Sequence, residues 1–191
     1  MAKRIESTLI NMILSLMFIS MGMSATLTFV YLKTKGPIEN AARQKEISAI
    51  KQVLPEFNSD PIANQMEEQG LKVYAPEKNN QPVGYAIKTF SDKGFGGKIE
   101  LMAGFLPDSS IYDVTVLQHK ETPGLGTRMT DDKFKNQFLG KNPDKFILKV
   151  KKDGGNVDAI TAATISSRAY CDALQRAFDS FKQLEDSLSK K

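Results

Sequence analysis

Thr164 closes a short segment in which a carboxylate and two hydroxyls are separated by small residues. The segment is Asp158-Ala159-Ile160-Thr161-Ala162-Ala163-Thr164, with the pattern D-x-x-T-A-A-T. It directly precedes a stretch from Ile165 to about Leu188 in which apolar residues recur every three or four positions, the spacing of one helix face. Thr164 is therefore expected in the first turn of a helix, where backbone N–H groups lack intrahelical acceptors and the helix dipole is positive. A phosphate beside the Thr164 hydroxyl would be stabilised there without any Lys or Arg.

The same residues also fit a plain helix start. Asp158 or Thr161 would then cap the helix, which stabilises it by about 1 kcal/mol, and Ala162 and Ala163 would serve helix propensity alone. Spacing by itself favours this simpler interpretation.

A second stretch with chemical potential runs from His119 to Gly126 at the end of a strand-like run. Pro123-Gly124 followed by Leu125-Gly126 predicts a sharply turned loop whose backbone N–H groups can face a ligand, and Glu121 and Thr122 add a carboxylate and a hydroxyl. A third stretch, Gly94-Phe95-Gly96-Gly97, permits close approach to the backbone. Each stretch taken alone also fits an ordinary turn, and neither matches the spacing of a nucleotide-triphosphate or dinucleotide loop.

Together the three stretches resemble the FMN-binding domains of the Rnf complexes and the sodium-pumping NADH:quinone reductases. That family carries the flavinylation motif D-x-x-[ST]-[GA]-A-T, a glycine-rich G-[YF]-x-G segment and an E-T-P-G-L-G loop, in the order found here. Ala162 stands where the motif often has Gly, a change expected to cost little backbone freedom. The E-T-P-G-L-G loop, the G-F-G-G segment and the short length are more similar to the G subunit of Rnf than to the C subunit of the quinone reductase.

The resemblance implies that Thr164 carries FMN covalently through a phosphoester. A separate flavin transferase would make the bond with FAD as donor, which supplies the activation that an isolated Thr hydroxyl lacks at neutral pH. The cofactor-binding residues implied are those of the motif segment and of the turned loop: Thr164, Asp158, Thr161, Ala162, Ala163, Glu121, Thr122, Gly124, Leu125 and Gly126.

The chain would then be an electron-transfer subunit, with no catalytic residue of its own and no activity alone. Its partners would be the other membrane subunits of an ion-translocating ferredoxin:NAD oxidoreductase complex. The alternatives are the C subunit of a sodium-pumping quinone reductase, another extracytoplasmic flavin carrier, and, in a different class, a membrane-anchored assembly module without a redox role.

Residues 9–32 contain no charge and are long enough to cross a hydrocarbon core of roughly 30 Å. They are longer than the apolar region of a signal peptide and lack a clear A-x-A-like cleavage site, so an uncleaved anchor is expected. Charges on the two sides of the span are balanced and do not set its orientation. The resemblance implies an inner-membrane, single-pass protein with its soluble domain on the extracytoplasmic (periplasmic) side.

The remaining elements predict an α+β domain with a twisted antiparallel sheet packed against helices. Gly36-Pro37 is expected to break the membrane helix and Ile38–Leu54 to form a second helix. Residues 55–82 are expected to be loop, with room for one strand at Lys72-Val73-Tyr74. Further strands are expected at 83–90, 98–105, 111–118 and 146–150, with a short helical pattern around Phe134.

These elements and the resemblance divide the chain into four parts. Residues 1–8 form a short cytoplasmic tail, 9–32 the transmembrane helix, 33–82 a connecting helix and loop, and 83–191 the FMN-binding core.

Composition excludes several other classes. One Cys and one His in 191 residues exclude an intrachain disulfide framework and leave no set of ligands for a Cys/His zinc site. Cys171 is expected to be a packing residue and His119 a surface residue. The net charge of +4 is interpreted as solvated surface and not as a nucleic-acid site, because basic and acidic residues appear interleaved along the chain.

Overall fold

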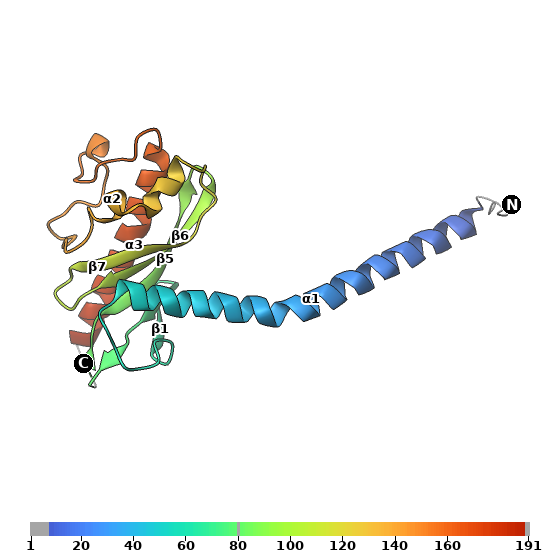
Figure 1. The fold of residues 1–191 in the computed structure, drawn as a ribbon, viewed down its shortest axis with the longest axis horizontal. Coiled ribbons are helices and arrows are strands. Elements are labelled where there is room, and N and C mark those ends of the chain that lie inside the picture. Colours follow the sequence, from blue (N-terminus) through green and yellow to red (C-terminus); the bar gives the residue numbers. More distant parts are fainter. Residues whose placement is uncertain (1–7, 80, 190–191) are drawn as a thin grey trace. The chain divides into compact units, whose positions relative to one another are not determined.

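The computed structural model describes residues 8–79 and 81–189, so the predicted tail at residues 1–7 lies outside the described residues, as does the side chain of Leu188. Figure 1 shows the order of the elements along the chain. They are α1 (Leu9–Val53), β1 (Gln65–Glu68), β2 (Leu71–Tyr74), β3 (Glu77–Lys78), β4 (Gln81–Pro82), β5 (Tyr85–Gly94), β6 (Gly97–Phe105), β7 (Ile111–Gln118), the 3-10 turn Gly126–Thr130, α2 (Asp132–Lys135), the 3-10 turn Lys151–Asp153 and α3 (Thr164–Ser189).

An antiparallel sheet with the strand order β1-β2-β5-β6-β7 forms the centre of the globular part. The predicted meander is confirmed by β5, β6 and β7, which follow one another in the chain and pair as neighbours. Two further strands, β1 and β2, join its edge from a region predicted to be loop with one strand. The α+β class is therefore confirmed.

Each face of the sheet is covered by a helical segment. On one face, β5 and β6 pack against α3, and the buried core there includes Ile87, Phe105, Leu174 and Phe181. On the other face, Ile50 and Val53 at the end of α1 pack with Met102 and Tyr74. Because alternate residues of a strand point to opposite faces, a strand buried on both sides is largely apolar throughout. The run Leu101-Met102-Ala103 in β6 meets this requirement.

The expected break at Gly36-Pro37 is wrong, because α1 continues through Pro37 as one helix. Proline removes one backbone hydrogen bond and crowds the preceding turn, and Gly36 has low helix propensity, but the helix runs through both residues. Within the described residues, α1 is the helix long and apolar enough to cross a membrane, with a mean hydropathy of 1.9 over its most apolar 18 residues.

The predicted strand at residues 146–150 is also absent. The segment keeps the alternation of a strand, with Phe146, Leu148 and Val150 inward, but it lacks a neighbouring strand to pair with and makes only the single bridge between Val150 and Val157. Alternation of apolar and polar residues indicates only that one face of a segment is buried. A strand also needs a neighbouring segment with which its backbone can form hydrogen bonds.

Gly104 sets the distance between β6 and the end of α1. A Cβ atom placed on Gly104 would lie 1.7 Å from the carbonyl oxygen of Val53, whereas one placed on Gly36 would meet nothing within 4 Å. We expect Gly104→Ala to lower the free energy of unfolding by about 1–3 kcal/mol, the usual cost of overpacking. Thermal unfolding of the full chain in detergent measures this, with Gly36→Ala as the matched control; equal midpoints for the two variants would contradict it.

Candidate functional site

The start of α3 borders a cavity of about 320 Å³ to which three separate stretches of the chain contribute. Its walls come from the glycine-rich turn, the E-T-P-G-L-G loop and the motif segment: Phe95, Glu121, Thr122, Leu125, Gly126, Ala162, Ala163, Thr164, Ile165 and Ser166. The structure thus brings together seven of the ten predicted cofactor-binding residues. Sequence reasoning did not single out Phe95, Ile165 or Ser166 as lining residues.

Glu121 joins the three stretches. Its side chain is buried, with 5 % of the residue exposed, and one carboxylate oxygen accepts a hydrogen bond from the backbone N–H of Gly96 (3.0 Å). The other oxygen accepts from the Ser166 hydroxyl (2.5 Å), in the first turn of α3. A Cβ on Gly126 would lie 2.5 Å from the same carboxylate, so the glycine is required by the close approach of Glu121.

Thr164 begins α3, as predicted. The turn before it is fixed by Ser167, whose hydroxyl accepts a hydrogen bond from the Ile160 N–H (2.9 Å) and donates one to the Ala163 carbonyl (3.0 Å). Ser167 N–H itself bonds the Ala163 carbonyl, which leaves the N–H groups of Thr164 and Ile165 without an acceptor in the part of the chain that the structure describes. No acidic residue belongs to this first turn, so its free N–H groups can act as donors to an anion at the start of α3.

Ala162 adopts a left-handed backbone conformation, with φ of 61°. This corrects the expectation that Ala in place of Gly costs little, because a left-handed φ places the Cβ of an L-residue close to the following carbonyl at about 1–2 kcal/mol. The sharp turn brings the chain from the buried Ile160 back to the start of α3.

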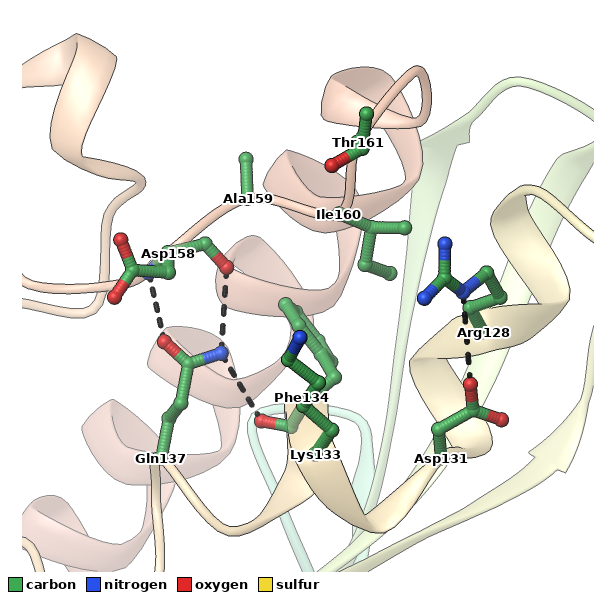
Figure 2. A pocket seen from close by; sticks show the side chains of 9 residues that line it. All are labelled: Arg128, Asp131, Lys133, Phe134, Gln137, Asp158, Ala159, Ile160 and Thr161. Atoms are coloured by element: carbon green, nitrogen blue, oxygen red, sulfur yellow. Dashed lines mark hydrogen bonds and ion pairs between the residues drawn. The ribbon is translucent and has the colours of Figure 1, made fainter.

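Asp158 and Thr161 lie beside the first cavity and line a second one of about 350 Å³, shown in Figure 2. Asp158 does not cap α3: its carboxylate is exposed and pairs with Lys151 (2.8 Å). Its backbone is held instead by the Gln137 amide, which accepts from the Asp158 N–H (2.7 Å) and donates to the Asp158 carbonyl (3.3 Å). Gln137 was missed because nothing in the sequence near it marks a contact with a residue 21 positions away.

Gly124, the tenth predicted residue, turns the E-T-P-G-L-G loop with φ of 76° and lies outside the lining of the first cavity. Its N–H donates to the Thr127 hydroxyl (2.9 Å), which holds the loop closed.

The residues present fit an FMN group. The phosphate would be held by the donors at the start of α3 beside the Thr164 hydroxyl. Phe95, Leu125 and Ile165 are 70 %, 42 % and 48 % exposed and offer apolar surface to a flat ring at the cavity wall.

Among the described residues, neither Cys171 nor a group of metal-ligating side chains forms a second reactive site. Burial raises the pKa of Cys171 to about 12, which keeps the thiol protonated and unreactive. No group of metal-ligating side chains is found among residues 8–79 and 81–189.

Comparison with known proteins agrees with this geometry. Residues 94–179 match the family model described as an FMN-binding domain. The chain is 31 % identical over 184 residues to the G subunit of the ion-translocating oxidoreductase complex of Aliivibrio fischeri, covering 86 % of each protein. It is 33 % identical over 176 residues to the protein of that name from Methanosarcina acetivorans, covering 88 % of this chain and 92 % of the relative.

Two further similarities cover less of the partner protein or are weaker. The chain is 37 % identical over 107 residues to the G subunit of the proton-translocating ferredoxin:NAD(+) oxidoreductase complex of Clostridium ljungdahlii, and the match spans 57 % of that protein. The crystal structure of Shewanella oneidensis NqrC is similar with a TM-score of 0.48 and 20 % identity, covering 74 % of this chain and 71 % of that one.

The hydrogen bonds of Glu121 predict an order of stability losses. Glu121→Ala leaves the Gly96 N–H and the Ser166 hydroxyl unpaired and is expected to cost about 1–3 kcal/mol for the buried hydroxyl, and less for the half-buried N–H. Glu121→Gln keeps the side-chain volume and one acceptor oxygen and should cost less than Glu121→Ala. Ser166→Ala leaves one oxygen of the buried carboxylate without its donor and is also expected to destabilise the chain. Urea unfolding followed by tyrosine fluorescence measures the series; equal losses for the Ala and Gln variants would contradict the predicted order, because Gln keeps the volume and an acceptor that Ala removes.

The backbone of Ala162 predicts opposite effects for a smaller and a larger residue. Ala162→Gly relieves the left-handed strain and is expected to be neutral or slightly stabilising, since the entropy of the unfolded Gly chain offsets part of the gain. Ala162→Val places a β-branched side chain at a positive φ and is expected to cost about 1–2 kcal/mol or more. The same unfolding measurement compares them, and a Val variant as stable as the wild type would contradict the assigned conformation.

Proposed function

The chain belongs to the family of the G subunits of the ion-translocating oxidoreductase complexes, and from this premise we propose that it carries FMN covalently through a phosphoester on Thr164. It is a membrane-associated, FMN-binding electron-transfer subunit of such a complex. The single observation that carries the finer proposal is the position of the Thr164 side chain, at the first residue of α3 and on the wall of the cavity.

The bond would be made by a flavin transferase, a partner that the sequence resemblance implies. The Thr164 oxygen bonds to the phosphorus of the FMN half of FAD, the P–O bond of the diphosphate breaks, AMP leaves, and the hydroxyl proton is released. Within the described residues no side chain hydrogen-bonds the Thr164 hydroxyl, which fits activation by a separate enzyme. The exposed Ala162 and Thr161 leave the segment accessible to it.

Once attached, FMN would supply the redox chemistry, and this chain's residues would bind and orient it. The N–H groups at the start of α3 hold the phosphate, Glu121 fixes the distance between the glycine-rich turn and α3, and Phe95 and Leu125 flank the cavity. A covalent bond prevents loss of the cofactor from a domain that faces away from the cytoplasmic FMN pool.

The membrane arrangement is also part of the proposal. We propose that residues 9–32 of α1 cross the inner membrane, that 1–8 stay cytoplasmic, and that 33–82 connect the anchor to the FMN-binding core at 83–191 on the extracytoplasmic side. The connecting part also adds β1, β2 and the end of α1 to the sheet and its packing. The apolar surface of the first part of α1, with Leu9, Phe18 and Leu27 exposed, suits a lipid environment.

The test is flavin attachment to the full chain produced together with a flavin transferase. Thr164→Val removes the hydroxyl with little change of shape and is expected to abolish the FMN mass increment and the in-gel flavin fluorescence. Thr115→Val, on β7 and paired with Met102 on the opposite face of the sheet from α3, is the matched control and should keep both signals. If the wild type gains no flavin from a transferase that modifies another substrate, the segment is only a helix start.

A further inference from the structure

Positive charge is concentrated in one segment of the chain. Residues 133–152 hold seven lysines and a single acidic residue, a formal charge of +6 in a chain whose total is +4, so the other residues sum to −2. The interpretation of evenly interleaved charge therefore does not hold for this segment, and the function proposed above does not use it.

Most of these lysines are exposed and form no ion pair. Five of the seven are exposed and make no ion pair within the described residues: Lys133, Lys141, Lys145, Lys149 and Lys152. The exceptions are Lys135, which is half-buried against Asp113 (3.1 Å), and Lys151, which pairs with Asp158 as described above. Like charges gathered in one exposed segment create a positive field that can attract an acidic surface on another protein.

The exposed side chains of residues 145–149 combine charge with one apolar group. Lys145, Ile147 and Lys149 are exposed, whereas Phe146 and Leu148 between them are half-buried and buried. Ile147 is 53 % exposed. An isolated apolar side chain surrounded by cations is suited to a small contact on a protein that is otherwise acidic.

This basic segment is fastened to the loop that carries Thr164. The bridge from Val150 to Val157, the Lys151–Asp158 ion pair and the Gln137–Asp158 hydrogen bonds join the two. Lys133 lines the cavity of Figure 2 together with Thr161, and Lys149 lines another, of about 360 Å³, together with Arg168 in the second turn of α3. A protein held by the lysines would therefore lie next to the start of α3.

We propose that residues 133–152 are a docking surface for an acidic patch on another protein of the complex, which they hold beside the cofactor loop. The inference rests on the proposed function, because docking there matters only if Thr164 carries the redox group. Fixed positive charge near the exchange site raises the rate of productive encounter with an acidic surface, and it does so most at low salt.

A protein surface fits these observations better than an anionic membrane. Segments that lie in a lipid interface bury a row of large apolar side chains, whereas in the exposed positions of 145–149 Ile147 stands alone among lysines. Binding to lipid is kept as an outcome of the test.

The experiment compares two charge-reversed variants of the full chain assembled in its complex. Lys145→Glu/Lys149→Glu reverses the docking surface, and Lys72→Glu/Lys78→Glu changes the net charge equally at exposed lysines outside it that also lack an ion pair in the described residues. The readout is the rate at which the FMN of this chain is reduced by the complex, followed by stopped-flow absorbance. Ionic strength is varied from about 0.01 M, where the Debye length is about 30 Å, to about 1 M, where it is about 3 Å.

At low salt we expect the FMN of the 145/149 variant to be reduced at least roughly tenfold more slowly than that of the wild type. The reduction rate of this variant should also lose most of its dependence on salt concentration. The 72/78 variant should behave as the wild type. Equal rates for all three proteins, or equal losses for the two variants, would overturn the docking surface. An effect present in vesicles containing phosphatidylglycerol and absent in pure phosphatidylcholine would assign the segment to lipid and overturn it as well.

Flavin content is measured first, by in-gel fluorescence of each variant. A wild-type chain without bound flavin would refute the proposed function, whereas flavin-loaded variants with unchanged rates would refute only the docking surface. Ile147→Ala, which removes the apolar contact and leaves the charge, is expected to slow reduction at every salt concentration without changing the salt dependence.

Discussion

The buried carboxylate of Glu121 is the constraint on which the site depends. It joins three stretches of the chain through two hydrogen bonds, to Gly96 and to Ser166, and Gly126 leaves room for it because a Cβ there would clash with the carboxylate. A carboxylate at this depth is stable only while its oxygens are paired. The glycine-rich turn and the E-T-P-G-L-G loop must therefore keep their positions relative to α3, and the cavity exists because they do.

Much of this arrangement was predictable from sequence, for reasons that differ between elements. The meander of β5 to β7 and the start of α3 at Thr164 follow from local alternation and helix periodicity, which survive folding because one face of each element is buried. The resemblance identified two loops near the site that turn chemistry alone could describe only as turns. In the structure both loops line one cavity together with the motif segment.

The sequence did not predict the contacts between residues far apart in the chain, or the backbone conformation that these contacts impose. Gln137 holds Asp158 across 21 positions, and Ser167, not Asp158 or Thr161, fixes the turn before α3. The left-handed φ of Ala162 comes from the same turn and has no signal in an Ala-Ala pair. Local propensity was overruled in the opposite direction at Gly36-Pro37, where α1 continues through two residues that usually end a helix.

Two demands on the loop that carries Thr164 explain why its surroundings are built as they are. Under the proposed function, a transferase must reach the Thr164 hydroxyl and electron exchange requires the attached group to be held in one place, so the segment must be accessible but not mobile. Gln137 and Ser167 hold the backbone of the loop by hydrogen bonds, and the left-handed Ala162 sets its turn. The side chains of Thr161 and Ala162 nevertheless stay exposed. The lysines of 133–152 then lie on an element that is already fixed by its bonds to that loop. A partner that binds them gains a defined position relative to Thr164 without any further ordering of the chain, and that lowers the entropic cost of association.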